Sequence, residues 1–76
     1  MIPIDVQRRI ADFLVKHKRF AFTEGHLRLH ILGTTKHHDG GTDYAVRTAI
    51  QDAYGKQQIF NSHIRIYPTG HLRLIR

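Results

Sequence analysis

The spacing of the apolar residues changes along this chain, and this change limits the folds that the chain can adopt. In the first part, apolar side chains recur every three or four residues, at Val6, Ile10, Phe13 and Leu14, with His17 on the same stripe. This is the period of an amphipathic helix that buries one face. Pro3 suits the first turn of such a helix, because proline lacks an N–H that would be unpaired there.

A second stripe with the helical period runs from Val46 to Tyr54. Thr42 precedes it as the predicted N-cap, and Asp43 suits the positive end of the helix dipole. Gly55 follows the last apolar residue, and glycine is common just past a helix end. The sequence therefore predicts a second helix from Thr42 to Gly55.

Elsewhere the apolar period falls to two, which is typical of β-strands. Two hairpins are predicted: residues 19–23 with 26–32 around Glu24-Gly25, and residues 59–67 with 71–75 around Pro68-Thr69-Gly70. Proline and glycine favour the second turn, since proline presets one backbone angle and glycine adopts left-handed conformations. The polar segment 33–41, GTTKHHDGG, is expected to be a loop.

The order helix, hairpin, loop, helix, hairpin predicts an α+β fold with the arrangement αββαββ. We expect one antiparallel sheet of about four strands with both helices packed on one face. The 76 residues form one small basic domain without cysteine, so neither disulfides nor thiolate metal sites stabilise it. A homodimer would add buried surface that a domain of this size lacks.

The pentapeptide GHLRL occurs twice, at residues 25–29 and 70–74, and the related HIRI occupies residues 63–66. On a strand, alternate side chains face opposite sides. The apolar positions, Leu27, Leu29, Ile31, Ile64, Ile66, Leu72 and Leu74, would then face the helices. The opposite face would carry His26, Arg28, His30, His63, Arg65, Tyr67, His71 and Arg73, with no acidic residue among them.

A three-residue turn at 68–70 places Arg65 directly opposite Arg73. Like charges in opposed positions destabilise a pair of strands. The pairing suggests an absent anion, most simply the phosphate oxygens that guanidinium groups grip in bidentate fashion. The alternative interpretation is two solvated arginines that splay apart.

The orientation of Phe20 and Phe22 depends on the first predicted turn. A two-residue turn at Glu24-Gly25 places both rings in the core, whereas a three-residue turn places both among the histidines and arginines as stacking platforms for bases. The core orientation is favoured because so small a domain needs apolar volume. Tyr67 is the better candidate for exposed stacking.

The formal net charge is +6 from 12 Lys and Arg against six Asp and Glu. This excess favours polyanionic partners, and the sequence predicts a small non-enzymatic protein that binds DNA or RNA through Arg28, Arg65 and Arg73. His26, His63, His71 and Tyr67 would add hydrogen bonds or stacking. An inhibitor or adaptor that docks onto an acidic partner protein is the alternative, because basic and aromatic residues also suit protein interfaces.

A metal-independent ribonuclease is a further alternative, in which His71 with His63 or His26 would act as general acid and base. The sequence contains no local catalytic signature. His37, His38 and Asp39 could donate to a metal, but the chain has no cysteine and no HxxxH pair on a predicted helix. We therefore predict neither a metal nor another cofactor.

No apolar run reaches the roughly 18 residues of a membrane span, and the first residues lack the basic and then apolar order of a signal peptide. The expectation from these observations is a cytoplasmic protein without membrane contact.

Overall fold

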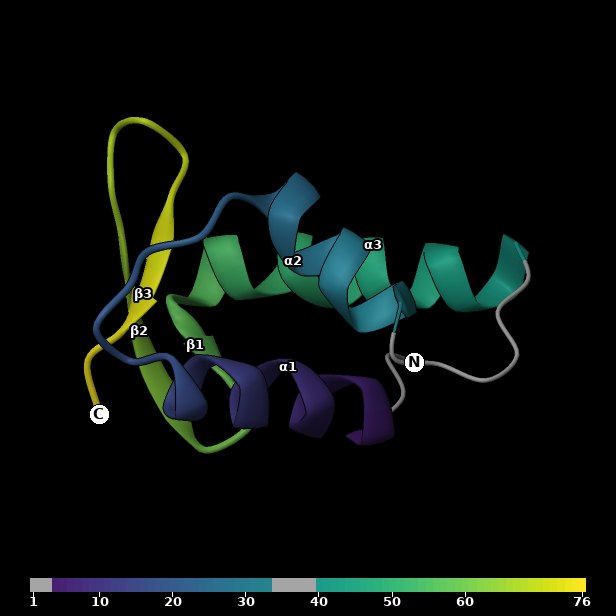
Figure 1. The fold of residues 1–76 in the computed structure, drawn as a ribbon, viewed down its shortest axis with the longest axis horizontal. Helices are drawn as coiled ribbons and strands as arrows, with labels where there is room; N and C mark the ends of the chain where they lie inside the picture. Colours follow the sequence, from purple (N-terminus) through teal and green to yellow (C-terminus); the bar gives the residue numbers. More distant parts are fainter. Residues whose placement is uncertain (1–3, 34–39) are drawn as a thin grey trace.

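The computed structural model describes residues 4–33 and 40–76, which form three helices followed by three short strands (Figure 1). The elements are α1 (Ile4–Lys16), α2 (Glu24–Gly33), α3 (Gly40–Lys56), β1 (Gln58–Ile59), β2 (Ser62–Ile66) and β3 (Leu72–Leu74). The α+β class is confirmed. The predicted αββαββ order is not found, because the described part of the chain has three helices and a three-stranded sheet.

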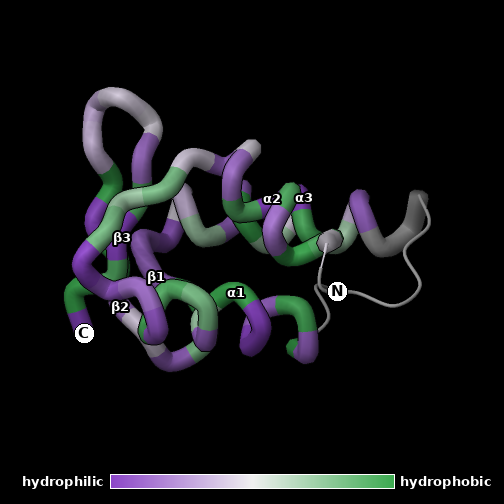
Figure 2. The backbone as a smooth tube through the Cα atoms, viewed as in Figure 1, coloured by the Kyte–Doolittle hydropathy of each residue, from purple (hydrophilic) through white to green (hydrophobic). Residues whose placement is uncertain are grey.

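The sheet is antiparallel with the order β1-β2-β3, and the helices lie to one side of it (Figure 1). Its inner face contributes Ile59, Ile64 and Leu72 to the core, each at most 4 % exposed. Hydrophobic and hydrophilic stretches alternate along the helices, as Figure 2 shows. The helices add most of the remaining buried residues: Ile10, Ala11, Phe13, Leu14, Leu27, Ile31, Val46, Ala49, Ile50 and Ala53.

Helix α1 confirms the first apolar stripe, since its buried side chains include Ile10, Phe13 and Leu14. Helix α3 confirms the second stripe, but it begins at Gly40, before the predicted N-cap Thr42, and continues past Gly55. Gln57, instead of a glycine, has the left-handed conformation that follows this helix, with φ 54°. The carbonyl of Gln57 accepts a hydrogen bond from the N–H of Ile64 at 3.0 Å, so tertiary pairing with the sheet holds it there.

The second predicted hairpin is confirmed in its register. Arg65 pairs with Arg73 and Ile66 with Leu72, and Gly70 has the positive φ, 88°, that its turn requires. The predicted strand 59–67 is interrupted, because a turn that includes Phe60 at φ 53° folds residues 58–59 back as β1 against β2.

The first predicted hairpin is wrong, because residues 24–33 form α2 instead of a strand. The side chain of Thr23 accepts a hydrogen bond from the N–H of His26 at 3.3 Å, which is the geometry of an N-cap. Leu27 and Ile31 lie one helical turn apart and are 0 % and 3 % exposed, whereas Leu29, a predicted core residue, is 74 % exposed. Four apolar residues at 27, 29, 31 and 32 fit an alternating strand and an i, i+4 helix equally well, and the core selects the helix.

Of the first predicted strand, 19–23, a single bridge remains. Phe22 and Leu72 exchange two backbone hydrogen bonds of 2.8 Å, which attach this segment to the open edge of β3. The predicted fourth strand is therefore replaced by one paired residue. The predicted loop 33–41 lies mainly outside the described residues, including His37, His38 and Asp39; its first residue ends α2 and its last two begin α3.

Candidate nucleic-acid interface

Five of the eight predicted site residues share the outer face of the β2-β3 hairpin. His63, Arg65 and Arg73 are exposed, and Tyr67 and His71 are half-buried. The ladder places Arg65 beside Arg73, and the N–H of Tyr67 donates to the carbonyl of His71 at 2.8 Å. Because alternate residues of a strand share a face, these five side chains lie on the side of the sheet away from the core.

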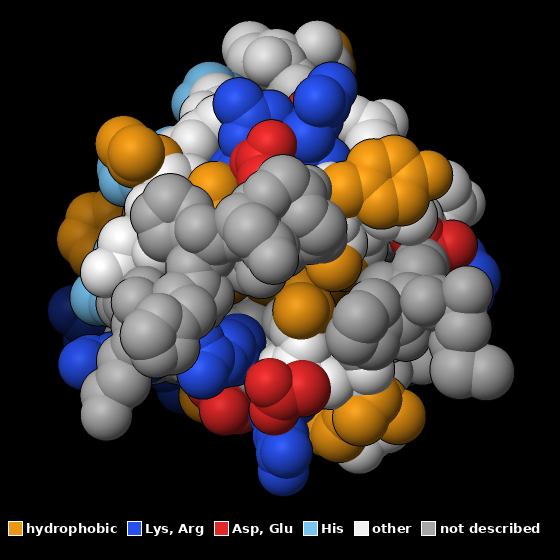
Figure 3. Space-filling view, turned by 90° about the vertical axis from the view of Figure 1, so that its right-hand side faces the viewer, with side chains coloured by type: hydrophobic (Ala, Val, Ile, Leu, Met, Phe, Trp, Pro, Cys, Tyr) orange, Lys and Arg blue, Asp and Glu red, His pale blue; other side chains and the backbone are white. Residues whose placement is uncertain are grey.

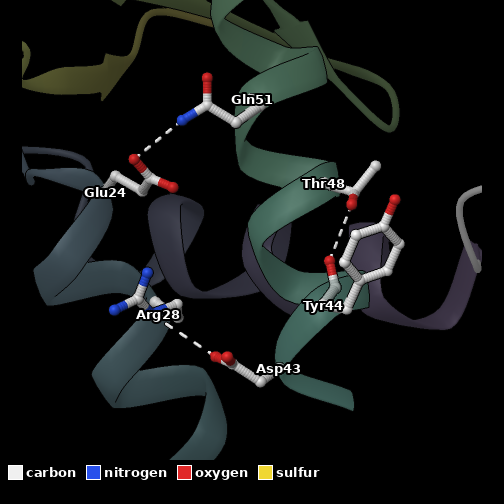
Figure 4. A network of polar contacts seen from close by, with 6 residues as sticks. All are labelled: Glu24, Arg28, Asp43, Tyr44, Thr48 and Gln51. Atoms are coloured by element: carbon white, nitrogen blue, oxygen red, sulfur yellow. Dashed lines mark hydrogen bonds and ion pairs between the residues drawn. The ribbon is translucent and has the colours of Figure 1, made fainter. Parts of the chain in front are cut away.

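The other three predicted site residues, His26, Arg28 and His30, lie on α2 and not on the sheet. Arg28 instead forms an ion pair with Asp43 of α3, with Nε 3.6 Å from Oδ1 (Figure 4). Nearby, the Gln51 amide donates to Glu24 Oε2 at 2.9 Å, which joins the same two helices. These polar contacts link α2 to α3, so Arg28 is not part of the predicted sheet face.

His26 and His30 pack against aromatic rings of the core edge. The His26 ring lies edge-on to Phe22 with centroids 5.3 Å apart, and the His30 ring is 4.1 Å from Phe13. The ring of His17, the residue directly after α1, has its centroid 4.7 Å from that of Phe13. Three histidines therefore lie against two phenylalanines, and the helical geometry of α2 accounts for the positions of two of them, His26 and His30.

The opposed arginines have different surroundings. Arg73 Nε donates to the backbone carbonyl of Lys18 at 3.2 Å, which draws this guanidinium toward the segment after α1. The contact uses one of the five N–H donors of the guanidinium and leaves the others available to a ligand. It also gives Arg73 a structural role, so an anion is not required to explain the pairing.

The tertiary structure brings further basic residues beside this face that the sequence pattern did not indicate. The Phe22–Leu72 bridge and the Arg73–Lys18 hydrogen bond bring Lys18 and Arg19 beside the hairpin. The backbone carbonyl of Arg76 accepts from the N–H of His63, which places the last residue beside β2. We name the resulting set the basic sheet surface: Lys18, Arg19, Arg65, Arg73 and Arg76. One feature of the sequence could have indicated these basic residues: the segments 13–23 and 53–76, which contain all five, have no Asp or Glu.

All acidic residues that the structure describes are on the helices. The described helices carry six Lys and Arg and five Asp and Glu, so their charges nearly cancel. The basic sheet surface carries five positive charges, and all five of its residues are exposed. The ion pairs join α1, α2 and α3 residues only, and none involves the basic sheet surface within the described chain. Figure 3 shows the helix side opposite the sheet, where basic and acidic side chains lie next to each other.

Two apolar side chains are exposed close to these charges. Phe20 is 61 % exposed and Ile75 is 53 % exposed, whereas Phe22 is 8 % exposed and packs against Phe13. Sequence reasoning placed Phe20 and Phe22 on the same side. The structure separates them, because residues 19–23 are not a regular strand and only Phe22 pairs with β3.

Tyr54 of α3 fixes the hairpin turn to the helical layer. Its hydroxyl donates to the carbonyl of Gly70, and burial, together with the nearby Glu24 carboxylate, raises the pKa of Tyr54 above 10.0. A phenol is protonated at neutral pH, as this hydrogen bond requires, and the raised pKa extends the protonated range to higher pH. The turn at 68–70 is therefore held against α3.

The hairpin register separates His71 from His63, one of the two histidine pairs of the ribonuclease alternative. His71 pairs with Tyr67, which is four strand residues from His63, or about 13 Å along the backbone. A general acid and base acting on one phosphate must both lie within hydrogen-bond reach of it, so this separation does not favour a pair. Among the described residues no group of three His, Asp or Glu side chains could hold a metal ion.

No family model, curated protein or solved structure matches this chain. In the described ranges, none of the helices has the length and apolar character needed to cross a membrane.

Proposed function

We propose that this protein is a non-enzymatic nucleic-acid-binding protein that holds the phosphate backbone of DNA or RNA on the basic sheet surface. One observation carries the proposal: among the described residues, most of the excess positive charge lies on the β2-β3 hairpin and the segments beside it, without ion pairs to described carboxylates. Five exposed cations on one face can replace the counterions of several phosphates, and this exchange supplies most of non-specific nucleic-acid affinity.

The neighbouring side chains add contacts of a second kind. Phe20 is exposed and follows directly after Lys18 and Arg19, so a base can stack on its ring while its phosphate meets the cations. Half-buried Tyr67, directly after β2, continues the alternation of His63 and Arg65 and therefore lies on the same face of the hairpin. The proposed surface therefore combines cations and an aromatic platform, and it contains His63 and His71 as further hydrogen-bond donors.

Helix α3 is the other surface that could contact nucleic acid, since a helix fits the major groove of a duplex. Its exposed residues include Tyr44, Arg47 and Gln51. Its other cation, Lys56, is paired with Asp52, with Nζ 3.2 Å from Oδ2. With so few available cations, α3 would neutralise fewer phosphates than the basic sheet surface, which is why the proposal rests on the sheet.

The test is the salt dependence of binding. Fluorescence anisotropy of labelled single-stranded and duplex DNA and RNA is measured at several salt concentrations for the wild type and for the double variant Arg65→Gln, Arg73→Gln. Removing two phosphate contacts should reduce the slope of log K against log salt by about 1.4 for single strands or about 1.8 for duplex DNA. The double variant Arg8→Gln, Arg47→Gln is the control. It has the same net charge as the Arg65→Gln, Arg73→Gln variant, but its changes are on the helices, so its slope should equal that of the wild type.

Two results would contradict the proposal. An unchanged slope in the Arg65, Arg73 variant with a reduced slope in the Arg8, Arg47 variant would place the contacts on the helices. Absence of binding at low salt, together with a stoichiometric complex with one acidic protein, would favour the adaptor function. Circular dichroism of each variant verifies that the fold is retained, since Arg73 also bonds the Lys18 carbonyl.

A further inference from the structure

A pocket of about 310 Å³ lies between α1 and α2, apart from the hairpin. The described residues that line it are Arg9, Asp12, Phe13 and Lys16 of α1 and His30 and Ile31 of α2. The α1 residues occupy positions i, i+3, i+4 and i+7, so they share one face of the helix. The volume falls at the lower end of the range for small-molecule sites.

The floor of this pocket is aromatic and apolar. Phe13 is 9 % exposed and Ile31 is 3 % exposed, and the imidazole of His30 lies against the Phe13 ring with centroids 4.1 Å apart and planes 38° apart. His30 itself is exposed, so its imidazole is accessible to a ligand. A flat ring can extend such a stack.

The rim carries charges of both signs. Arg9 and Lys16 lie two helical turns apart, or about 10 Å along α1, with Asp12 between them. Arg9 also pairs with Asp5, with Nε 3.8 Å from Oδ2. Lys16 and Asp12 form no ion pair or hydrogen bond with other described side chains, so an ammonium donor and a carboxylate acceptor are available on one rim.

From these features we infer that the pocket between α1 and α2 binds a nucleoside monophosphate. The base would stack on the His30–Phe13 pair, the phosphate would meet Lys16, and Asp12 would accept a hydrogen bond from an N–H of the base edge. A nucleotide combines all three properties, whereas a simple phosphate lacks the ring and the donor, and an uncharged nucleoside lacks the anion. The inference does not depend on the basic sheet surface.

The pocket is tested with adenosine 5′-monophosphate, adenosine and ribose 5-phosphate, by following backbone amide shifts in NMR spectra of the whole chain. The monophosphate should cause saturable shifts at residues 12–16 and 30–31 below about 10 mM, and the other two compounds should bind several-fold more weakly. Lys16→Gln should weaken the monophosphate about three- to fivefold. Lys56→Gln, which removes one lysine charge outside the pocket, should not change its affinity.

A second variant tests the role of Asp12. Asp12→Ala should lower the preference for the monophosphate over ribose 5-phosphate about fivefold, because the base loses its acceptor. No saturable shift at the pocket, or equal affinities for the wild type and Lys16→Gln, would overturn the inference. The Arg65→Gln, Arg73→Gln variant should bind the monophosphate like the wild type, so failure of the basic sheet surface is distinguishable from failure of the pocket.

Competition separates two sources of the ligand. If the pocket receives a nucleotide at the end of a bound strand, the monophosphate should displace a labelled oligonucleotide at concentrations that fill the pocket. If the pocket takes a free nucleotide, the oligonucleotide should stay bound. Either result supports nucleotide chemistry at α1 and α2, provided that the amide shifts at residues 12–16 and 30–31 are present.

Discussion

Leu27 and Leu29 belong to the same GHLRL motif, but one is buried and the other is exposed. Replacing each with alanine measures how much this difference contributes to stability. Leu27 is 0 % exposed in the core, and Leu29 is 74 % exposed on the outer side of α2. If residues 26–32 formed a strand instead, both side chains would face the same side. The pair of substitutions therefore tests the helical conformation of α2 directly.

The expected magnitudes differ widely. Leu27→Ala removes a fully buried side chain and should lower the free energy of unfolding by about 2–5 kcal/mol. A domain of 76 residues has a total stability of about 4–11 kcal/mol, so this loss is a large fraction of it. Leu29→Ala should stay within about 0.5 kcal/mol of the wild type, because the site is exposed and alanine has the higher helix propensity.

Urea unfolding followed by far-ultraviolet circular dichroism measures both values, with the midpoint as the readout at constant m. In the second GHLRL copy, Leu72 is 1 % exposed, and Leu72→Ala should resemble Leu27→Ala as a buried control. Equal and large losses for Leu27→Ala and Leu29→Ala would refute the helical assignment of residues 24–33.

Three further predictions concern Tyr54, Gln57 and Arg28. Because the folded-state pKa of Tyr54 is raised, its contribution to the free energy of unfolding should be fully present below about pH 10 and should decrease as the pH rises toward the folded-state pKa. Tyr54→Phe should lower the free energy of unfolding by about 1 kcal/mol at neutral pH, because the hydrogen bond to Gly70 is lost. The urea midpoint of this variant should also decrease less at alkaline pH than that of the wild type. Gln57→Gly should increase the free energy of unfolding by about 1 kcal/mol and so raise the melting temperature, because glycine adopts the φ of 54° at this position without strain. A lower melting temperature would show that the Gln57 side chain stabilises the turn. Arg28→Ala should lower the free energy of unfolding by less than about 1 kcal/mol, because its ion pair with Asp43 is exposed to solvent. The salt dependence of nucleic-acid binding should not change in this variant. A reduced slope would show that Arg28 contacts the nucleic acid.

Sequence patterns predicted the elements whose signals are long or chemically specific. The stripe of α1 spans three turns, and the turn at 68–70 contains both a proline and a glycine, so helix α1 and the register of Arg65 with Arg73 follow from local rules. The signal at residues 24–33 is short, and its apolar spacing fits two periods. The N-cap at Thr23 with Glu24 in the first turn was the local evidence for a helix, although a Glu-Gly turn was also compatible with it.

The candidate site was predicted in part for the same reason. His63, Arg65, Tyr67, His71 and Arg73 share a face because the second hairpin has the predicted register. Lys18 and Arg19 join them only through the bridge from Phe22 to Leu72, and no local pattern indicates that pairing. The residues assigned to the first hairpin left the predicted face when α2 formed, and Arg28 paired with Asp43 instead.

The sequence by itself determined the α+β class, the amphipathic α1, the C-terminal hairpin and an excess of positive charge, because each of these depends on composition or on neighbours within a few residues. The tertiary structure decided which copy of GHLRL became a helix, which of Phe20 and Phe22 was buried, and where the charge collected. These outcomes depend on contacts between distant segments: α2 packs Leu27 and Ile31 into a core shared with α1 and α3, and Phe22 pairs with Leu72 across 50 residues of chain. The two copies of one pentapeptide therefore adopt different structures because their partners in the core differ.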